Sequence, residues 1–189
     1  MVDILTIEES FPAQCSGLPR SPGLHLSTVI RVMEQALHGP RKPSGWMMDE
    51  TREVGFIWED LLSLVLAQRQ VPEPLRPEEI VVDGIAMSPD GIGLWEGHVV
   101  LEEYKCTWAS INNRSPDTHW PWLVQSKSDC RAIHVNQVIF RILDLMGDYK
   151  GSGPLYRAYL LTYTDRDLEE NWQMVLNHKQ MALDALGIQ

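Results

Sequence analysis

The sequence predicts an α/β chain of the α+β type, with a central mixed β-sheet flanked by helices. Two segments with apolar residues at helical spacing come first, and short alternating segments bounded by glycine follow them. A further pair of strand-like segments then lies between two more helical segments. At 189 residues the chain can bury one sizeable core. We therefore expect a single domain over residues 25–189, after an extended, proline-bearing lead-in over residues 1–24.

Two helices are predicted in the N-terminal part of this domain. Ser27 is a suitable N-cap for a helix over Thr28–Leu37, which His38-Gly39-Pro40 would end. A longer helix is expected over Thr51–Gln70, where apolar residues again recur every three or four positions. Prolines from Pro72 onward would break the chain after it.

Three short strands are predicted next, over Ile80–Met87, Gly91–Trp95 and His98–Thr107. Turns that carry glycine separate them, which is typical of an antiparallel meander. Pro121 suits an early position of a helix, and no residue after it breaks the helical pattern. We therefore expect a helix over Trp122–Ile133.

The C-terminal part predicts two paired strands and a closing helix. Val135–Leu145 is rich in β-branched and aromatic residues, and a loop separates it from the alternating segment Tyr156–Thr162. Asp165–Leu186 has its apolar residues on one helical face, so it predicts an amphipathic helix.

The candidate chemistry lies on the predicted meander. Asp90 is at a turn, and the strand after it carries Glu103 and Lys105 on one face, with Glu102 and Tyr104 on the other. Two carboxylates can bind Mg²⁺ through oxygen and leave positions for water and a phosphate. A lysine beside them can hold or deprotonate an attacking water. These residue types suit metal-dependent phosphodiester hydrolysis, although such a triplet on a strand is more often a solvated face.

The same alternation separates two adjacent acids. It directs Glu102 away from Lys105 and Glu103 toward it. We therefore expect Glu102→Ala to keep most activity and Glu103→Ala to lose it.

A family resemblance strengthens this interpretation. The run Val82–Gly91, followed by Val99–Lys105, resembles the PD-(D/E)xK nuclease superfamily, in particular the phage and prophage exonucleases related to lambda exonuclease and the RecB nuclease domain. Pro89-Asp90 with Glu103-x-Lys105 forms the signature, and the resemblance extends from about His25 onward. It implies a restriction-endonuclease-like core and a Mg²⁺-dependent deoxyribonuclease, in which Mn²⁺ can substitute.

Two further segments are similar to parts of that family. Glu59 lies where the family carries a glutamate on an upstream helix, and Trp122-x-x-Gln125 is similar to a motif on the helix after the signature strand. The usual tyrosine four residues past that glutamine is Asp129 here, and Gln137 is an alternative to Gln125. The implied metal ligands are Asp90, Glu103, the Tyr104 carbonyl and Glu59, and the implied catalytic residues are Asp90, Glu103, Lys105 and Gln125.

The formal net charge of −10 argues against broad, nonspecific binding to nucleic acid. DNA remains compatible with this charge if the cations gather around a cleft. The expected cations there are Arg31, Arg41, Lys42, Arg52 and Arg114, and the expected substrate contacts are Ser27, Arg31 and Arg52. Asp83 is a candidate for an additional metal ligand, although Asp-Gly is more often a plain turn.

Three functions stay open. The first is an exonuclease that acts on double-stranded DNA ends in phage recombination or replication, and the second is an endonuclease of the same fold. The third is a non-catalytic module that binds DNA or protein, which the acidic charge favours. A homo-oligomer and a phage single-strand annealing or binding protein are the expected partners.

The sequence also predicts where the protein is found. The N-terminus has no basic segment, and no apolar run reaches membrane-spanning length. Three cysteines without paired spacing indicate a reducing compartment. We therefore expect no membrane contact and a cytoplasmic location in a bacterial host cell.

Overall fold

The computed structural model describes residues 21–39, 47–68, 74–108, 115–147, 150–151 and 153–188. Most of the predicted lead-in lies outside these residues, as do Arg41, Lys42 and Arg114. The elements are α1 (Leu26–His38), α2 (Met47–Gln68), β1 (Ile80–Val82), β2 (Ile85–Met87), β3 (Gly91–Trp95), β4 (His98–Thr107), the 3₁₀ turn η2 (Pro116–Thr118), α3 (Trp120–Ala132), β5 (Gln137–Asp144), β6 (Leu155–Thr162) and α4 (Asp165–Leu186).

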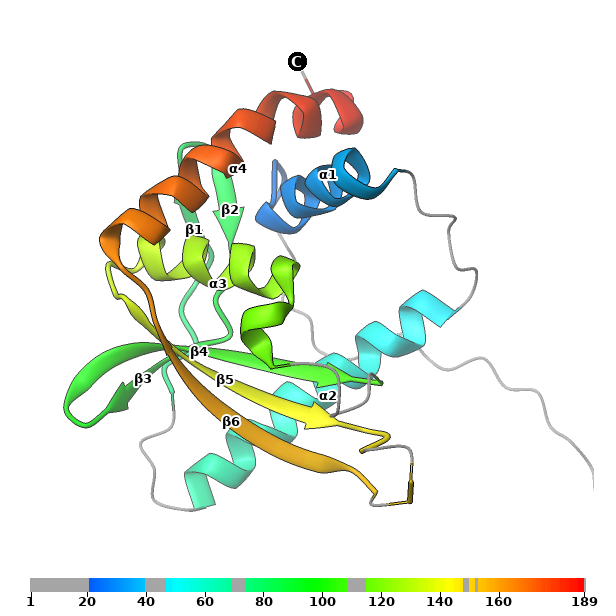
Figure 1. Cartoon of the computed structure of the whole chain (residues 1–189), viewed down its shortest axis with the longest axis vertical. Helices are drawn as coiled ribbons and strands as arrows, with labels where there is room; N and C mark the ends of the chain where they lie inside the picture. The colour runs from blue at the N-terminus through cyan, green and yellow to red at the C-terminus, as the bar shows by residue number, and fades with distance from the viewer. Residues whose placement is uncertain are drawn as a thin grey trace, which may run out of the picture.

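A four-stranded sheet of order β3-β4-β5-β6 forms the centre of the molecule. Strands β4 and β5 run parallel, and the two outer pairs are antiparallel. Figure 1 shows α1, α3 and α4 grouped on one side of this sheet and α2 on the other. The predicted mixed sheet flanked by helices is therefore confirmed.

The predicted three-strand meander is wrong in its first strand. Residues 80–87 form two strands, β1 and β2, which pair with each other and make a separate two-stranded sheet. Asp83 and Gly84 make the turn between them, with φ angles of 51° and 74°. Asp-Gly favours such left-handed turns, so this dipeptide ends one strand and starts another.

The β1–β2 hairpin is anchored on α4 through Asp83. The Asp83 carboxylate accepts a hydrogen bond from Trp172 Nε1 at 2.8 Å, and its carbonyl accepts one from Lys179 Nζ at 2.6 Å. Asp83 is therefore a turn residue that faces α4, and the structure does not bring it to the other acids.

The start of α1 also differs from the prediction. The helix begins at Leu26, its N-cap is His25, and Ser27 lies within the first turn. The side chain of His25 contacts Glu79 Oε1 at 3.2 Å and the Ser21 carbonyl at 2.8 Å. Leu24 is already buried, and its carbonyl accepts a hydrogen bond from the Ala86 amide. Packing against the domain therefore starts no later than Leu24.

The two faces of β4 pack against different helices. Leu101 contributes to a buried cluster with α3, β5 and Leu168 of α4, whereas Tyr104 packs against α2 around Trp58 and Leu62. Alternation along β4 therefore directs Glu103 and Lys105 toward the α3 side and Glu102 toward the α2 side. This partition determines which polar side chains can meet.

Candidate active site

The backbone of β4 holds Asp90 in place at the start of the site. Asp90 immediately precedes β3, and its Oδ2 accepts a hydrogen bond of 2.8 Å from the Tyr104 amide. In an extended strand the N–H and C=O of one residue face the same neighbouring strand. The carbonyl of Tyr104 therefore faces the same edge as Asp90, where β3 has not yet begun.

Lys105 links the side chains of this cluster. Its Nζ lies 2.6 Å from Glu103 Oε2 and 3.8 Å from Asp90 Oδ2, and it donates a hydrogen bond of 3.3 Å to Gln125 Oε1. Glu103 is completely buried, while Asp90 and Lys105 keep small exposed fractions. The structure thus brings together Asp90 before β3, Glu103 and Lys105 of β4, and Gln125 of α3.

The charges of this cluster determine what Lys105 can do. Burial disfavours its ammonium form, but the carboxylates of Glu103 and Asp90 outweigh that effect and raise the pKa of Lys105. Without a metal ion, Lys105 is therefore protonated and is a hydrogen-bond donor. This charge favours a role in holding a water or a phosphate oxygen over a role as the base.

Asp129 is a member of the cluster that sequence reasoning left without a role. It lies one helical turn after Gln125 on α3 and is 1% exposed. Its carboxyl group is within hydrogen-bond reach of the Glu103 carboxyl, and no nitrogen or hydroxyl of the described residues donates to it. Burial and the neighbouring Glu103 raise the pKa of Asp129 well above its ordinary range. The i, i+4 spacing from Gln125 was the available signal, since it places both residues on one helix face.

Glu59 approaches the cluster from α2. Its Oε2 accepts a hydrogen bond of 2.8 Å from Arg76 Nη2. Burial and the charge of Asp90 raise the pKa of Glu59 to about 7, although Arg76 and Lys105 act in the opposite direction. The charge of Asp90 thus acts on Glu59, and the role of Glu59 as a metal ligand stays a prediction.

These residues fit a hard divalent cation that keeps several waters. Within the described ranges no three His, Cys, Asp or Glu side chains form a ready metal cage. Among the described residues, the buried carboxyl groups of Glu103 and Asp129 outnumber the single ammonium of Lys105. Asp90, Glu103 and the Tyr104 carbonyl supply oxygen ligands of the kind that Mg²⁺ prefers.

Two of the three expected substrate residues border a cavity beside the cluster. Ser27 and Arg31 border a cavity of about 250 Å³ between α1, β2 and α3, and Gln125 and Asp129 border it too. The side chain of Arg52 lies outside the described residues. Gln137, the alternative to Gln125, is the first residue of β5. Its side chain donates a hydrogen bond of 3.2 Å to Thr162 Oγ1.

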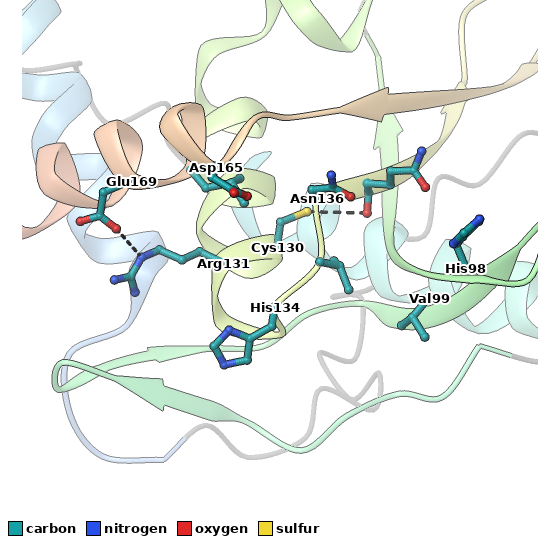
Figure 2. Close-up of a pocket in the computed structure, with 11 residues that line it drawn as sticks. His98, Val99, Cys130, Arg131, His134, Asn136, Asp165 and Glu169 are labelled. Atoms are coloured by element: carbon teal, nitrogen blue, oxygen red, sulfur yellow. Dashed lines mark hydrogen bonds and ion pairs between the residues drawn. The ribbon is translucent and has the colours of Figure 1, made fainter.

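A larger cavity of about 540 Å³ lies elsewhere, at the C-terminal end of α3 (Figure 2). Arg131 is paired there with Glu169 at 3.2 Å, and Cys130 Sγ contacts the Gln137 carbonyl at 3.7 Å. Burial raises the pKa of Cys130, so its thiol is not an activated nucleophile. None of the clustered carboxylates lines this cavity, so we place the candidate active site at Asp90, Glu103 and Lys105.

No family model and no curated protein matches the sequence. The structure, however, is similar to LHK-Exo in complex with dAMP, with a TM-score of 0.55, 17% identity, and coverage of 87% of this chain and 90% of that one. The alkaline exonuclease LHK-Exo from Laribacter hongkongensis matches with a TM-score of 0.53 and 15% identity, over 86% of this chain and 79% of that one.

A phage-related exonuclease from Haemophilus somnus 129PT matches with a TM-score of 0.51 and 13% identity, over 85% of this chain and 81% of that chain. Identities this low show the fold and nothing finer. The chain therefore shares its fold with these exonuclease structures, and the expected restriction-endonuclease-like core is confirmed. In the described part of the chain, no helix combines the length and the apolar character that a membrane span requires.

The acidic cluster predicts how stability depends on pH in the absence of metal. The folded protein holds Glu59 at a pKa of about 7, above its ordinary 4.5, so it binds more protons than the unfolded chain between these values. The stabilisation that the Glu59 proton contributes is therefore fully present below pH 4.5. It is lost as the pH rises to about 7. We expect the free energy of unfolding in EDTA to fall by roughly 1–3 kcal/mol between pH 5 and pH 8.

Urea denaturation at several pH values measures this slope. Glu59→Gln and Asp129→Asn remove one raised carboxyl each and should flatten it, whereas Asp117→Asn on the exposed turn η2 should not. Stability that rises steadily from pH 5 to pH 8 would contradict the electrostatic account.

Proposed function

We propose that this protein is a divalent-cation-dependent nuclease that hydrolyses DNA phosphodiester bonds, acting as an exonuclease on double-stranded ends. The observation that supports the proposal most is the convergence of Asp90, Glu103 and Lys105 at the point where β3 begins. Mg²⁺ is the proposed cofactor, with Mn²⁺ as a substitute. Asp90, Glu103 and the Tyr104 carbonyl would hold the ion, with Glu59 contributing directly or through water.

The cation, Lys105 and Gln125 would each have a different role in hydrolysis. A divalent cation at this position would lower the pKa of water and offset the negative charge of the transition state. Lys105 keeps its proton and can donate to the attacking water or to a non-bridging phosphate oxygen. Gln125 orients Lys105 through its Oε1, which leaves its amide NH₂ to donate to water or phosphate.

The neighbouring cavity supports an end-binding mode of action. It is small, and Ser27 and Arg31 of α1 line it beside Gln125. A hydroxyl and a guanidinium can both donate to phosphate oxygens. We propose that the substrate strand enters between α1 and α3, and that a homo-oligomer and a single-strand annealing or binding protein are the partners.

Cleavage assays on two DNA topologies test the proposal. Purified protein is incubated with linear duplex and with covalently closed circular duplex, in Mg²⁺, Mn²⁺ or EDTA. An exonuclease degrades only the linear DNA and only with a cation. Nicking of the closed circle would identify the endonuclease alternative. Binding without any cation-dependent cleavage of DNA or RNA would identify the non-catalytic module that the net charge of −10 favours.

The metal assignment makes a separate prediction. Asp90→Asn keeps the shape of the side chain and an acceptor for the Tyr104 amide, but it removes a ligand charge. We expect Mn²⁺ affinity to fall at least about ten-fold, since hard cations depend on carboxylate charge. Isothermal titration calorimetry with Mn²⁺ measures it, with Asp117→Asn as the control. Unchanged Mn²⁺ affinity in Asp90→Asn would remove Asp90 from the ligand set.

A further inference from the structure

Most of the described cations are engaged by other groups of the chain. Arg141 and Arg157 each hold a buried carboxylate with two hydrogen bonds, Arg141 on the α2 face of the sheet and Arg157 on the α3 face, two strands from Lys105. The others with such engagements are Arg131 with Glu169, Arg166 with Glu170, Lys179 with the Asp83 carbonyl and Lys127 over the Tyr163 ring. Two other described guanidinium groups adjoin residues of the acidic cluster: Arg31 borders the cavity that Gln125 and Asp129 also border, and Arg76 is bonded to Glu59.

Arg76 is held in place by the backbone around it. The adjacent Leu75 exchanges two backbone hydrogen bonds with Ile92 of β3, at 2.9 and 2.8 Å. An added Cβ at Gly91 would lie 3.0 Å from Pro74 Cβ, so the segment also packs closely against the start of β3. These contacts with β3 therefore position Arg76 near Gly91, the residue after Asp90.

The side chain of Arg76 is only partly used. It donates one hydrogen bond of 2.8 Å, from Nη2 to Glu59 Oε2, and its side chain is 45% exposed while that of Glu59 is 15% exposed. A guanidinium has five N–H donors in a rigid fork. The remaining donors can hold a phosphate while the bond to Glu59 persists.

We propose that Arg76 is a substrate-binding residue that holds a backbone phosphate of the DNA strand on the α2 side of the carboxylate cluster. The proposal rests on the proposed nuclease function and extends it. Arg31 is on α1, which lies on the other side of the sheet from α2 (Figure 1), and it borders the same cavity as Gln125 and Asp129. A strand bridged between Arg31 and Arg76 would pass over Asp90 and Lys105.

Equilibrium binding of a short fluorescent duplex tests the proposal, using the full chain, anisotropy, and Ca²⁺ or EDTA at several salt concentrations. Arg76→Gln should weaken binding about ten-fold and lower the slope of log K against log salt by about one, as expected for one lost phosphate contact. In Mg²⁺ it should raise KM and change kcat less than about three-fold. Arg76→Lys should recover part of the affinity. Arg166→Gln, which also removes an arginine paired with a glutamate, is the control and should change neither quantity.

Two results would overturn the proposal. The first is an affinity and a salt slope in Arg76→Gln that equal those of the wild type or change equally in Arg166→Gln. The second is a loss of kcat at unchanged affinity, which would show that Arg76 acts only by orienting Glu59. Binding is measured without cleavage, so these results are distinguishable from a failure of the nuclease function, which would show as wild-type protein that never cuts.

Discussion

Lys105→Ala should lower turnover by at least about a hundred-fold, with DNA and cation affinity retained. Lys105 lies between Glu103 and Asp90, and the charge of these acids keeps it protonated. A fixed ammonium in this place acts mainly on the charge that develops in the transition state. Its removal takes away a cation that repels the metal ion, so Mn²⁺ should bind as tightly as before or more tightly.

Single-turnover cleavage and Mn²⁺ calorimetry together check this expectation. Lys179→Ala is the matched control, because Lys179 is bonded to a turn carbonyl far from the site. A Lys105→Ala enzyme with wild-type turnover would remove Lys105 from the chemistry. A loss of Mn²⁺ binding in the same variant would show that the residue supports the ion site instead.

The largest expected effect on stability belongs to Glu102, the neighbour of the catalytic acid. Glu102 is 2% exposed and accepts hydrogen bonds of 2.6 and 2.9 Å from Arg141, which also donates to the Tyr156 hydroxyl. An added Cβ at Gly93 would lie 2.8 Å from Glu102 Oε1, so the carboxylate is packed against β3. Removing one partner of such a pair leaves a buried, uncompensated charge, and we expect Glu102→Ala to cost about 3–5 kcal/mol.

Glu103 should show the opposite behaviour. Its carboxylate is buried beside Asp129, so Glu103→Gln should remove activity while leaving stability at pH 8 unchanged or higher. Urea denaturation and cleavage of the two variants separate these effects. Glu102→Ala is then expected to retain activity per folded molecule, as strand alternation predicts, but to lose folded protein. Equal activity losses per folded molecule would show that the register of β4 is wrong.

Local rules of sequence explain which features could be predicted. The alternation along β4 is a property of every extended strand, so the separation of Glu102 from Glu103 followed from the sequence alone. Helical spacing and proline positions located α3 and therefore the side from which Gln125 approaches. The β1–β2 turn was also encoded locally, in Asp83-Gly84, but its short flanking segments read equally well as one strand.

Long-range partners explain what could not be predicted. The Glu102–Arg141 pair joins residues 39 positions apart, and it depends on the parallel register of β4 and β5. Asp129 meets Glu103 only because α3 packs on that face of the sheet. Arg76 reaches Glu59 because Leu75 pairs with β3. No local periodicity specifies any of these contacts.

The central claim is that Asp90, Glu103 and Lys105 form a cation-dependent hydrolytic centre. The most direct measurement is the release of nucleotides from linear duplex DNA by the wild type and by Glu103→Gln, in Mg²⁺ and in EDTA, with folding checked by thermal denaturation. The wild type should cleave only with the cation, and the folded variant should be slower by at least about a hundred-fold. Cleavage that persists in EDTA, or a Glu103→Gln protein as active as the wild type, would contradict the claim.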